Sequence, residues 1–126
     1  MNKMFLLFSH SLTNEQIDDA NKKLQVYDFI SLPENLQKLW SNIPPELESL
    51  DEHLSSLKNY IRLAAKKGDY VLIQGDFGAV YEMVNFAKSL DLIPIYATTK
   101  REVVEEKQGD KVVKKSIFKH IRFRKY

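Results

Sequence analysis

Short apolar runs alternate with amphipathic stretches along most of the chain. Runs at 4–8, 26–32, 70–73 and 92–96 are rich in aliphatic and aromatic residues and are too short for buried helices, so each predicts a strand. Between them, apolar residues recur every three or four positions, which predicts helices near 13–24, 36–43, 46–67 and 80–87. Strands that alternate with helices favour a parallel sheet. We therefore expect an α/β fold in which helices flank a mostly parallel sheet.

Local signals mark the ends of several of these helices. Thr13 followed by Gln16 has the pattern of a capping box, which predicts a helix start. Pro44 should stop the helix near 36–43, and Pro45 is well placed to open the next one. That next helix is expected to be long, because its apolar stripe continues over 46–67.

The C-terminal part of the chain follows a different pattern. Segments 102–106 and 111–124 flank a turn signal at Gln108, Gly109 and Asp110, so we expect a β-hairpin over 102–125. In its second arm two sets of residues alternate: Ile117, Ile121 and Phe123 against Phe118, His120, Arg122 and Arg124. The first set should therefore face the core, and the second should form a basic face.

Composition limits the class of protein. A chain of 126 residues with 44% hydrophobic content can bury one core, so we expect a single domain over 1–126. With 19 basic and 17 acidic residues, the chain lacks the overall charge of a general polyanion binder, and no DNA partner is expected. Its basic residues concentrate in 111–126, which contains no acidic residue. Any basic site should therefore be local.

Two absences narrow the chemistry and the location. The chain has no cysteine, which excludes disulfides, thiolate catalysis and cysteine-ligated metal and fits an intracellular protein. The apolar run at 4–8 is too short for a signal sequence or a membrane span. We therefore expect a cytoplasmic protein with no membrane partner.

Polar residues follow three of the predicted strands, and the segment 69–79, DYVLIQGDFGA, is the central one. The carboxyl ends of parallel strands share one edge, where α/β proteins bind ligands. The first strand is followed by Ser9 and His10, and the last by Lys100 and Arg101. The candidate ligand-binding residues are Gln74, Gly75, Asp76, Phe77, Gly78, Thr98 and Thr99, with His120 and Arg122 from the hairpin. This set suits a phosphate-bearing ligand whose base could stack on an aromatic ring.

Each candidate also has an ordinary structural explanation. His10 could be a general acid or base, yet a single histidine at a strand end is often a hydrogen-bonded turn residue. Asp76 could contact a metal or a ribose hydroxyl, although a helix N-cap is the favoured interpretation. Lys100 and Arg101 could bind phosphate or lie in a solvated loop. The basic hairpin could form part of a groove or protect an edge strand from aggregation.

Four blocks of the sequence resemble a known family: FLLFSHSLT, LQKLWSNIPPEL, YVLIQGDFGAVYEMVNFA and LIPIYATTKREVVEE. They are similar to the small stand-alone CRISPR-associated proteins of the Csx20 type, which belong with type III systems. These proteins are related to the CARF domains, which are CRISPR-associated domains with a Rossmann-like fold. The similarity covers essentially the whole chain and implies a single CARF-like α/β domain.

The resemblance implies a ring nuclease that binds and cleaves cyclic oligoadenylates, with cyclic tetra-adenylate the expected ring, and thereby switches off type III signalling in antiviral defence. It also implies a homodimer, because the cyclic ligand of CARF proteins lies across a two-fold axis. The expected reaction is attack of a ribose 2′-hydroxyl on its own phosphodiester, without metal or other cofactor. The catalytic candidates are His10 as acid or base, Ser9 as an orienting group, and Lys100 and Arg101 as cations. A non-catalytic binder and a small RNA-binding module remain as alternatives.

Overall fold

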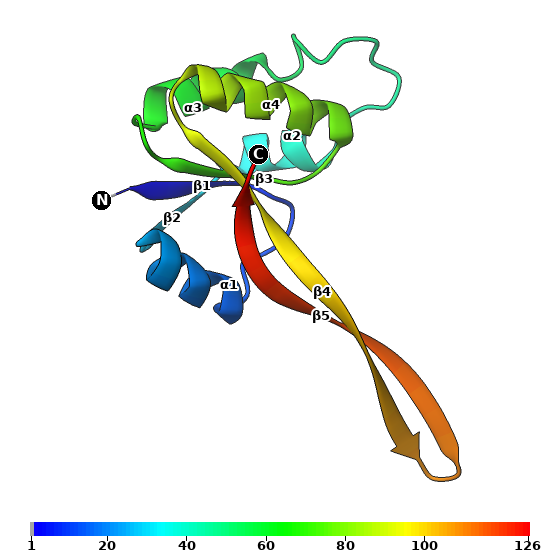
Figure 1. Cartoon of the computed structure of the whole chain (residues 1–126). Helices are drawn as coiled ribbons and strands as arrows, with labels where there is room; N and C mark the ends of the chain where they lie inside the picture. Colours follow the sequence, from blue (N-terminus) through cyan, green and yellow to red (C-terminus); the bar gives the residue numbers. More distant parts are fainter. Residues whose placement is uncertain (1) are drawn as a thin grey trace.

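The computed structural model describes residues 2–126 as a mixed α/β protein with a five-stranded sheet in the order β2-β1-β3-β4-β5 (Figure 1). The strands are β1 (Lys3–Leu7), β2 (Asp28–Ser31), β3 (Tyr70–Ile73), β4 (Ile93–Gln108) and β5 (Lys111–Lys125). Strands β1 to β4 pair with one another in parallel, and β5 pairs antiparallel with β4. The predicted fold class, with its C-terminal hairpin, is confirmed.

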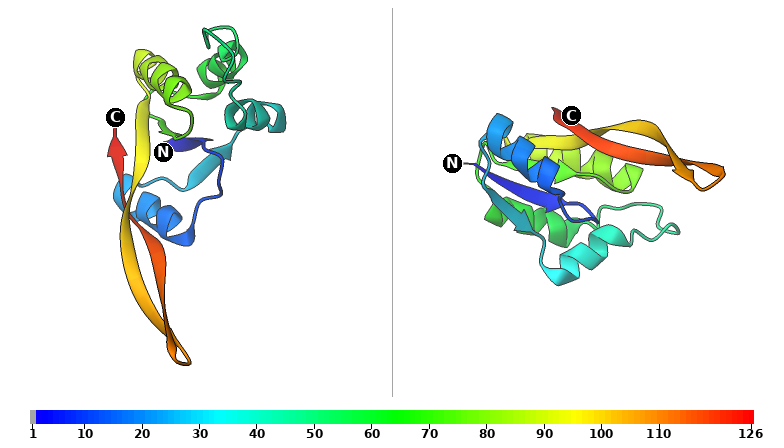
Figure 2. Two further views of the ribbon diagram at one scale, coloured as in Figure 1. Left: turned by 90° about the vertical axis from the view of Figure 1, so that its right-hand side faces the viewer. Right: turned by 90° about the horizontal axis from the view of Figure 1, so that it is seen from below.

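Helices cover both faces of the sheet (Figure 2). On one face lies α1 (Asn14–Asp19), which continues as a π-helical turn, η1 (Ala20–Leu24). The other face carries α2 (Glu34–Ser41), α3 (Ser55–Ala64) and α4 (Phe77–Ser89). None of the helices formed by residues 2–126 combines the length and the apolar character that a membrane crossing requires.

The predicted capping box at the start of α1 is present. The Thr13 hydroxyl accepts a hydrogen bond from the Gln16 amide at 3.2 Å, and the Gln16 side chain accepts one from the Thr13 amide at 2.9 Å. Both backbone amides would otherwise lack a partner within the helix. This reciprocal pair fixes where α1 begins after the end of β1.

Two apolar clusters fill the space between the sheet and the helices. The cluster under α2–α4 includes Phe5, Leu7, Trp40, Val71 and Ile73, and the smaller one under α1 includes Met4, Ala20, Leu72, Ile95 and Phe123. Adjacent residues of a strand belong to different clusters because their side chains point to opposite faces. Both faces of β3 are therefore buried, which explains its uninterrupted apolar sequence.

The long helix expected over 46–67 is wrong in its first half. Residues 44–54 are not helical and contain turns at 45–46 and 51–54, so α3 begins at Ser55, ten residues after Pro45. In this segment the Ser49 hydroxyl accepts a hydrogen bond from the Asp51 amide at 3.3 Å. Such side-chain bonds to nearby backbone compete with helix formation. Leu50 and Leu54 therefore contact the core from a loop rather than from the predicted helix, and Leu47 is exposed.

The strand end expected at Tyr96 is also wrong. β4 continues through Lys100 and Arg101 to Gln108 and pairs with β5 along this length, so the hairpin starts well before residue 102. The outer part of the two strands projects from the body as a two-stranded ribbon (Figures 1 and 2). Because no helix covers this ribbon, polar side chains suit both of its faces and do not mark the end of a strand.

A β-bulge alters the expected alternation in β5. Thr98 and Thr99 of β4 pair with Arg122 and His120 of β5, so Ile121 has no partner. An extra residue of this kind shifts every side chain beyond it to the opposite face.

Because of this shift, the core face predicted for the hairpin is wrong for two of its three residues. Phe123 is buried as expected, but Ile117 and Ile121 are 49% and 47% exposed. His120, expected on the basic face, instead lies beside Phe123, with ring centroids 4.9 Å apart. The sequence pattern alone could not locate the inserted residue, so it assigned the wrong residues to each face.

Candidate functional site

The carboxyl ends of β1 and β3 meet at the centre of the sheet. Leu7 pairs with Ile73, and the Gln74 amide donates a hydrogen bond to the Leu7 carbonyl at 3.0 Å. Because β2 lies on one side of β1 and β3 on the other, this is the point where α/β sheets commonly bind ligands. The structure therefore brings Ser9 and His10 to the same edge as the turn after β3.

A hollow of about 700 Å³ opens at the ends of β1 and β2. Ser9 and His10 line it and are exposed, and the His10 and Phe8 rings pack edge to face with centroids 5.4 Å apart. The start of α2 adds Glu34 and Lys38, whose charged groups are 3.3 Å apart. A histidine, several hydroxyls and the Glu34–Lys38 ion pair thus line one hollow.

The β2 side of this hollow was not predicted from the sequence. Ser31, Glu34, Gln37 and Lys38 all line it. The predicted strand 26–32 also ends at this edge, and the polar residues that follow it, Ser31 and those in the first turns of α2, were the signal that could have identified this side.

Hydrogen bonds fix the backbone that carries His10. The Ser9 and Ser41 hydroxyls are 3.0 Å apart, and the Gln37 side chain donates to both the Ser41 hydroxyl and the Phe8 carbonyl, each at 3.1 Å. These contacts tie the end of β1 to α2. Ser9 therefore has a partner that positions it, and that partner is not a base that would activate it as a nucleophile.

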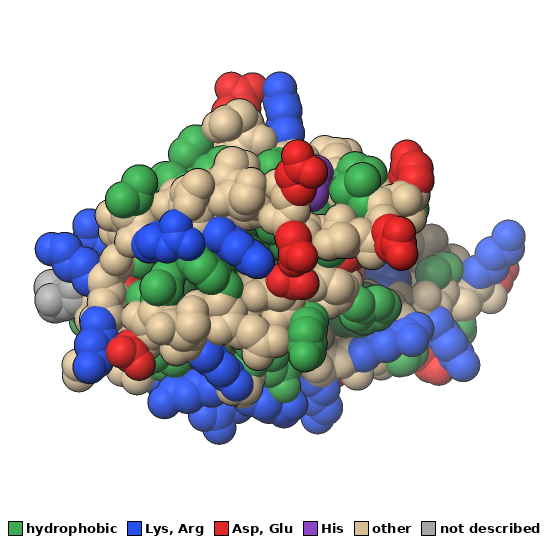
Figure 3. Space-filling view, turned by 90° about the horizontal axis from the view of Figure 1, so that it is seen from above, with side chains coloured by type: hydrophobic (Ala, Val, Ile, Leu, Met, Phe, Trp, Pro, Cys, Tyr) green, Lys and Arg blue, Asp and Glu red, His purple; other side chains and the backbone are tan. Residues whose placement is uncertain are grey.

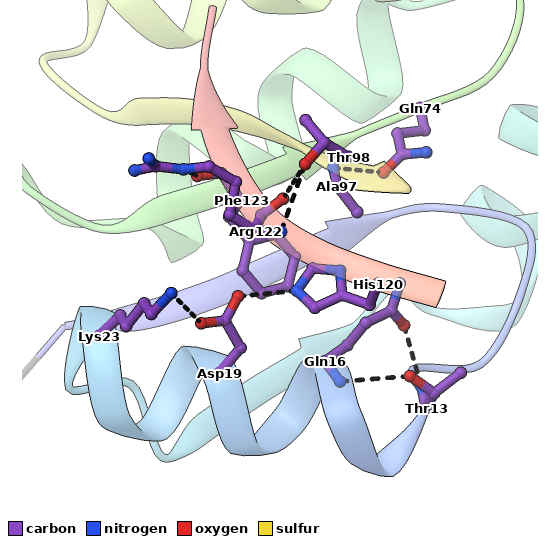
Figure 4. Close-up of polar contacts among 10 residues, drawn as sticks. All are labelled: Thr13, Gln16, Asp19, Lys23, Gln74, Ala97, Thr98, His120, Arg122 and Phe123. Carbon is purple, nitrogen blue, oxygen red and sulfur yellow. Dashed lines mark hydrogen bonds and ion pairs between the residues drawn. The ribbon is translucent and has the colours of Figure 1, made fainter. Parts of the chain in front are cut away.

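Gln74 joins three elements at the centre of the edge. Its side-chain oxygen accepts a hydrogen bond from the Ala97 amide of β4 at 2.9 Å (Figure 4). Its carbonyl accepts one from the Trp40 indole at 3.0 Å. A Cβ on Gly75 would lie 3.1 Å from the same indole nitrogen, which is tighter than ordinary contact. Gln74 and Gly75 were predicted from the sequence to bind a ligand. In the structure their contacts instead hold this turn in place.

The next residues of the turn start α4. The Asp76 carboxylate accepts a hydrogen bond from the Ala79 amide at 3.0 Å, so the favoured N-cap interpretation is correct. Its negative charge at the helix start disfavours a phosphate at the same amides. Phe77 is 94% exposed and remains available to a ligand. A Cβ on Gly78 would make only ordinary contacts, the nearest at 3.5 Å.

The residues of the third predicted strand end, Thr98 to Arg101, lie within β4 of the hairpin and not at the end of a strand. The Thr98 hydroxyl accepts a hydrogen bond from the Arg122 amide at 3.3 Å and donates one to the Arg122 carbonyl at 3.0 Å. The Arg101 guanidinium donates to the Ser116 hydroxyl at 2.9 and 3.1 Å. Neighbouring residues of a strand point to opposite faces, so Lys100 and Arg101 cannot act together at one site.

His120 is held between the hairpin and α1 (Figure 4). Its Nε2 lies 2.7 Å from the Asp19 carboxylate, and the two side chains are only 6% and 12% exposed. Lys23 approaches the other carboxylate oxygen at 3.7 Å. His120 also borders a hollow of about 430 Å³ with Thr99. Its buried contact with Asp19 anchors the root of the ribbon, whereas Arg122 is exposed.

Exposed cations follow the outer strand of the sheet. Viewed from above the helical layer, Lys and Arg side chains line one long edge of the molecule (Figure 3). In β5 the exposed cations are Lys111, Lys114, Lys115, Lys119, Arg122, Arg124 and Lys125. Among residues 2–126 no three His, Asp or Glu side chains gather as a metal site would require.

We expect the protein to lose stability at alkaline pH because of Tyr126. Its hydroxyl donates a hydrogen bond to the Ile73 carbonyl, and burial, followed by the nearby Tyr96, raises the pKa of Tyr126 above its ordinary value. The neutral phenol therefore favours the folded state up to pH about 10, the ordinary tyrosine pKa. This contribution is lost as the pH rises from there through the raised pKa.

Urea denaturation between pH 9 and pH 11 measures this effect. Tyr126→Phe should flatten the alkaline decline in unfolding free energy, whereas Tyr27→Phe, at a residue that is 61% exposed, should leave it unchanged. Equal declines in both variants would show that Tyr126 is not the group responsible.

Comparison with known proteins identifies the family. The family model described as "Uncharacterized protein MJ1673 family" matches residues 2–124. A protein of Methanocaldococcus jannaschii, "Uncharacterized protein MJ1673", is 56% identical over 126 residues, covering 100% of this chain and 98% of the relative. No solved structure gives a significant match. The chain belongs to the MJ1673 family.

Proposed function

We propose that this protein is a ring nuclease that binds a cyclic oligoadenylate, preferably cyclic tetra-adenylate, and cleaves it to end type III CRISPR signalling. The observation that supports this most is the hollow of about 700 Å³ that holds Ser9, His10 and Lys38 at the carboxyl edge of the sheet. A hollow of this size is typical of sites for small ligands. The sequence resemblance to CARF-related proteins supplies the identity of the ligand.

The residues around the hollow suit a reaction within the ligand. The ribose 2′-oxygen attacks its own phosphorus, the bond to the 5′-oxygen breaks, and the products are a 2′,3′-cyclic phosphate and a 5′-hydroxyl. His10 accepts the proton of the 2′-hydroxyl, and solvent at the open hollow protonates the 5′-oxygen. Lys38 offsets the charge that develops on phosphorus, and Ser9 orients the phosphate.

The same proposal includes a homodimer in the cytoplasm. A cyclic ligand with two-fold symmetry can contact the same strand ends in each of two subunits. Because β1 and β3 present their ends at one edge of each sheet, two such edges facing each other would enclose a ring on both sides. The reaction needs no cofactor, and neither DNA nor a membrane takes part.

A cleavage assay tests the proposed function. Purified full-length protein is incubated with cyclic tri-, tetra- and hexa-adenylate in EDTA, and the products are resolved by chromatography and identified by mass. We expect linear products ending in 2′,3′-cyclic phosphate, formed fastest from cyclic tetra-adenylate. Intact rings after prolonged incubation would rule out the enzymatic activity.

Two binding measurements separate the alternatives. Tight binding of cyclic tetra-adenylate with complete return of uncut ring would indicate a protein that sequesters the messenger. Salt-dependent affinity for ordinary single-stranded RNA, with no affinity for the ring, would favour an RNA-binding module that uses the basic edge of β5. The exposure of the β5 cations is the observation that supports this second candidate.

A further inference from the structure

A groove of about 390 Å³, separate from the two hollows described above, lies along the outer side of α4. Phe77, Tyr81 and Lys88 line it from the helix, and Tyr126 forms the opposite wall. Residues four apart lie on the same side of a helix, so Phe77 and Tyr81 present neighbouring rings to the groove. None of the candidate catalytic residues contributes to its lining.

The aromatic rings of this groove are not needed for the core. Phe77 is 94% exposed and Tyr81 is 72% exposed, whereas α4 uses Ala79, Met83 and Ala87 to pack against the sheet. A contiguous group of exposed apolar side chains, unlike a single exposed residue, is characteristic of a surface that binds a ligand or a partner. The groove therefore has a free aromatic wall that folding alone does not explain.

The opposite wall is held rigidly. Tyr126 donates its hydroxyl hydrogen bond to the Ile73 carbonyl, and its ring lies 4.8 Å from the Tyr96 ring, centroid to centroid. Arg124 in turn donates a hydrogen bond to the Tyr96 hydroxyl at 2.8 Å and lies 5.4 Å from the centre of that ring. A wall fixed in this way binds a flat group without losing side-chain freedom.

We propose that this groove is a nucleobase subsite in which a purine stacks on Phe77 and Tyr81 while Lys88 contacts the attached phosphate. Aromatic rings bind the flat faces of bases, and a lysine nearby suits the negative charge of a nucleotide. A purely apolar ligand would not use the cation, and a free phosphate would not use the rings. A nucleotide uses both.

The groove begins at the same sheet edge as the hollow. Phe77 follows Gln74 by three residues, and Gln74 is bonded directly to the end of β1. A ring of several adenylates presents more than one base, so one base can occupy the groove while another nucleotide lies in the hollow. Naming adenine as the base rests on the proposed function, whereas the stacking of a purine nucleotide does not.

Mononucleotide binding tests the subsite separately from cleavage. AMP, UMP and adenosine are titrated into the full-length protein and followed by calorimetry and by saturation transfer from the aromatic protons. The double variant Phe77→Ala/Tyr81→Ala should weaken AMP binding by about tenfold or more. Leu63→Ala, which removes an 87% exposed side chain outside the groove, should not. Lys88→Ala should weaken AMP but not adenosine.

The outcomes distinguish this inference from the proposed function. AMP affinity that is equal in the double variant and in Leu63→Ala would overturn the subsite, whatever the cleavage assay gives. Unchanged AMP binding combined with loss of self-association in sedimentation would overturn it in favour of a protein interface. Groove-dependent AMP binding by a protein that leaves cyclic tetra-adenylate intact would support the subsite and reject the ring nuclease.

Discussion

His10→Ala is expected to slow the cleavage of cyclic tetra-adenylate by about 10²–10⁴-fold, the usual contribution of a positioned general acid or base. The His10 ring lines the hollow at the end of β1, where hydrogen bonds between Ser9, Ser41 and Gln37 fix the backbone before it. Affinity for the ring should change only a few-fold, because the proton is transferred in the transition state. Single-turnover rates and direct binding measurements separate these two effects.

Two comparisons test the assignment of charges around His10. Lys38→Ala should slow cleavage more than Lys111→Ala, because Lys38 lines the hollow and Lys111 lies at the end of the ribbon. Lys100→Ala and Arg101→Ala should not have equal effects, since these side chains point to opposite faces of β4. Unchanged turnover in His10→Ala would remove this residue from the mechanism. Equal losses of cleavage rate in Lys38→Ala and Lys111→Ala would indicate that cations of the hairpin also contact the phosphates of the ligand.

Trp40→Ala is expected to lower the free energy of unfolding by about 3–5 kcal/mol, the range for removing a large buried aromatic side chain. Trp40 is 2% exposed, and its indole donates a hydrogen bond to the Gln74 carbonyl. The change both leaves a cavity under α2 and frees the turn after β3. Urea denaturation measures the loss, which should exceed that of the exposed control Leu63→Ala.

A second variant separates packing from the hydrogen bond. Trp40→Phe keeps much of the ring volume but leaves the Gln74 carbonyl without its donor, at a cost of about 1–3 kcal/mol. A loss in Trp40→Phe as large as that in Trp40→Ala would mean that the indole nitrogen matters more than the ring. No measurable loss in either would contradict the central position of Trp40 in the core cluster.

The sequence predicted the body of the fold well because burial leaves a clear pattern there. β1 and β3 are covered on both faces, and their apolar runs, 4–8 and 70–73, ended where the strands end to within a residue. Segment 44–54 was mispredicted because Leu50 and Leu54 contact the core although this segment is not helical. Periodicity indicates which side chains are buried. It cannot distinguish a helix from a loop that buries side chains at the same spacing.

The candidate site was predictable in position but not in its partners. Strand-end reasoning located Ser9 and His10 at the edge, whereas the contact of Trp40 with Gln74 joins residues that lie 34 positions apart. No local pattern signals such a contact. Likewise, the pairing of His120 with Asp19 spans 101 positions. These long-range contacts decide which polar residues hold the structure together and which remain free to meet a ligand.

The bulge at Ile121 also gives β5 one position at which its length can change without altering the ribbon. Because Ile121 has no partner in β4, deleting it would leave every pair between the two strands unchanged. Phe118 and His120 would still border the hollow at the start of α1. Losing a paired residue of β5 would instead put the residues beyond it out of register and exchange the faces that they present.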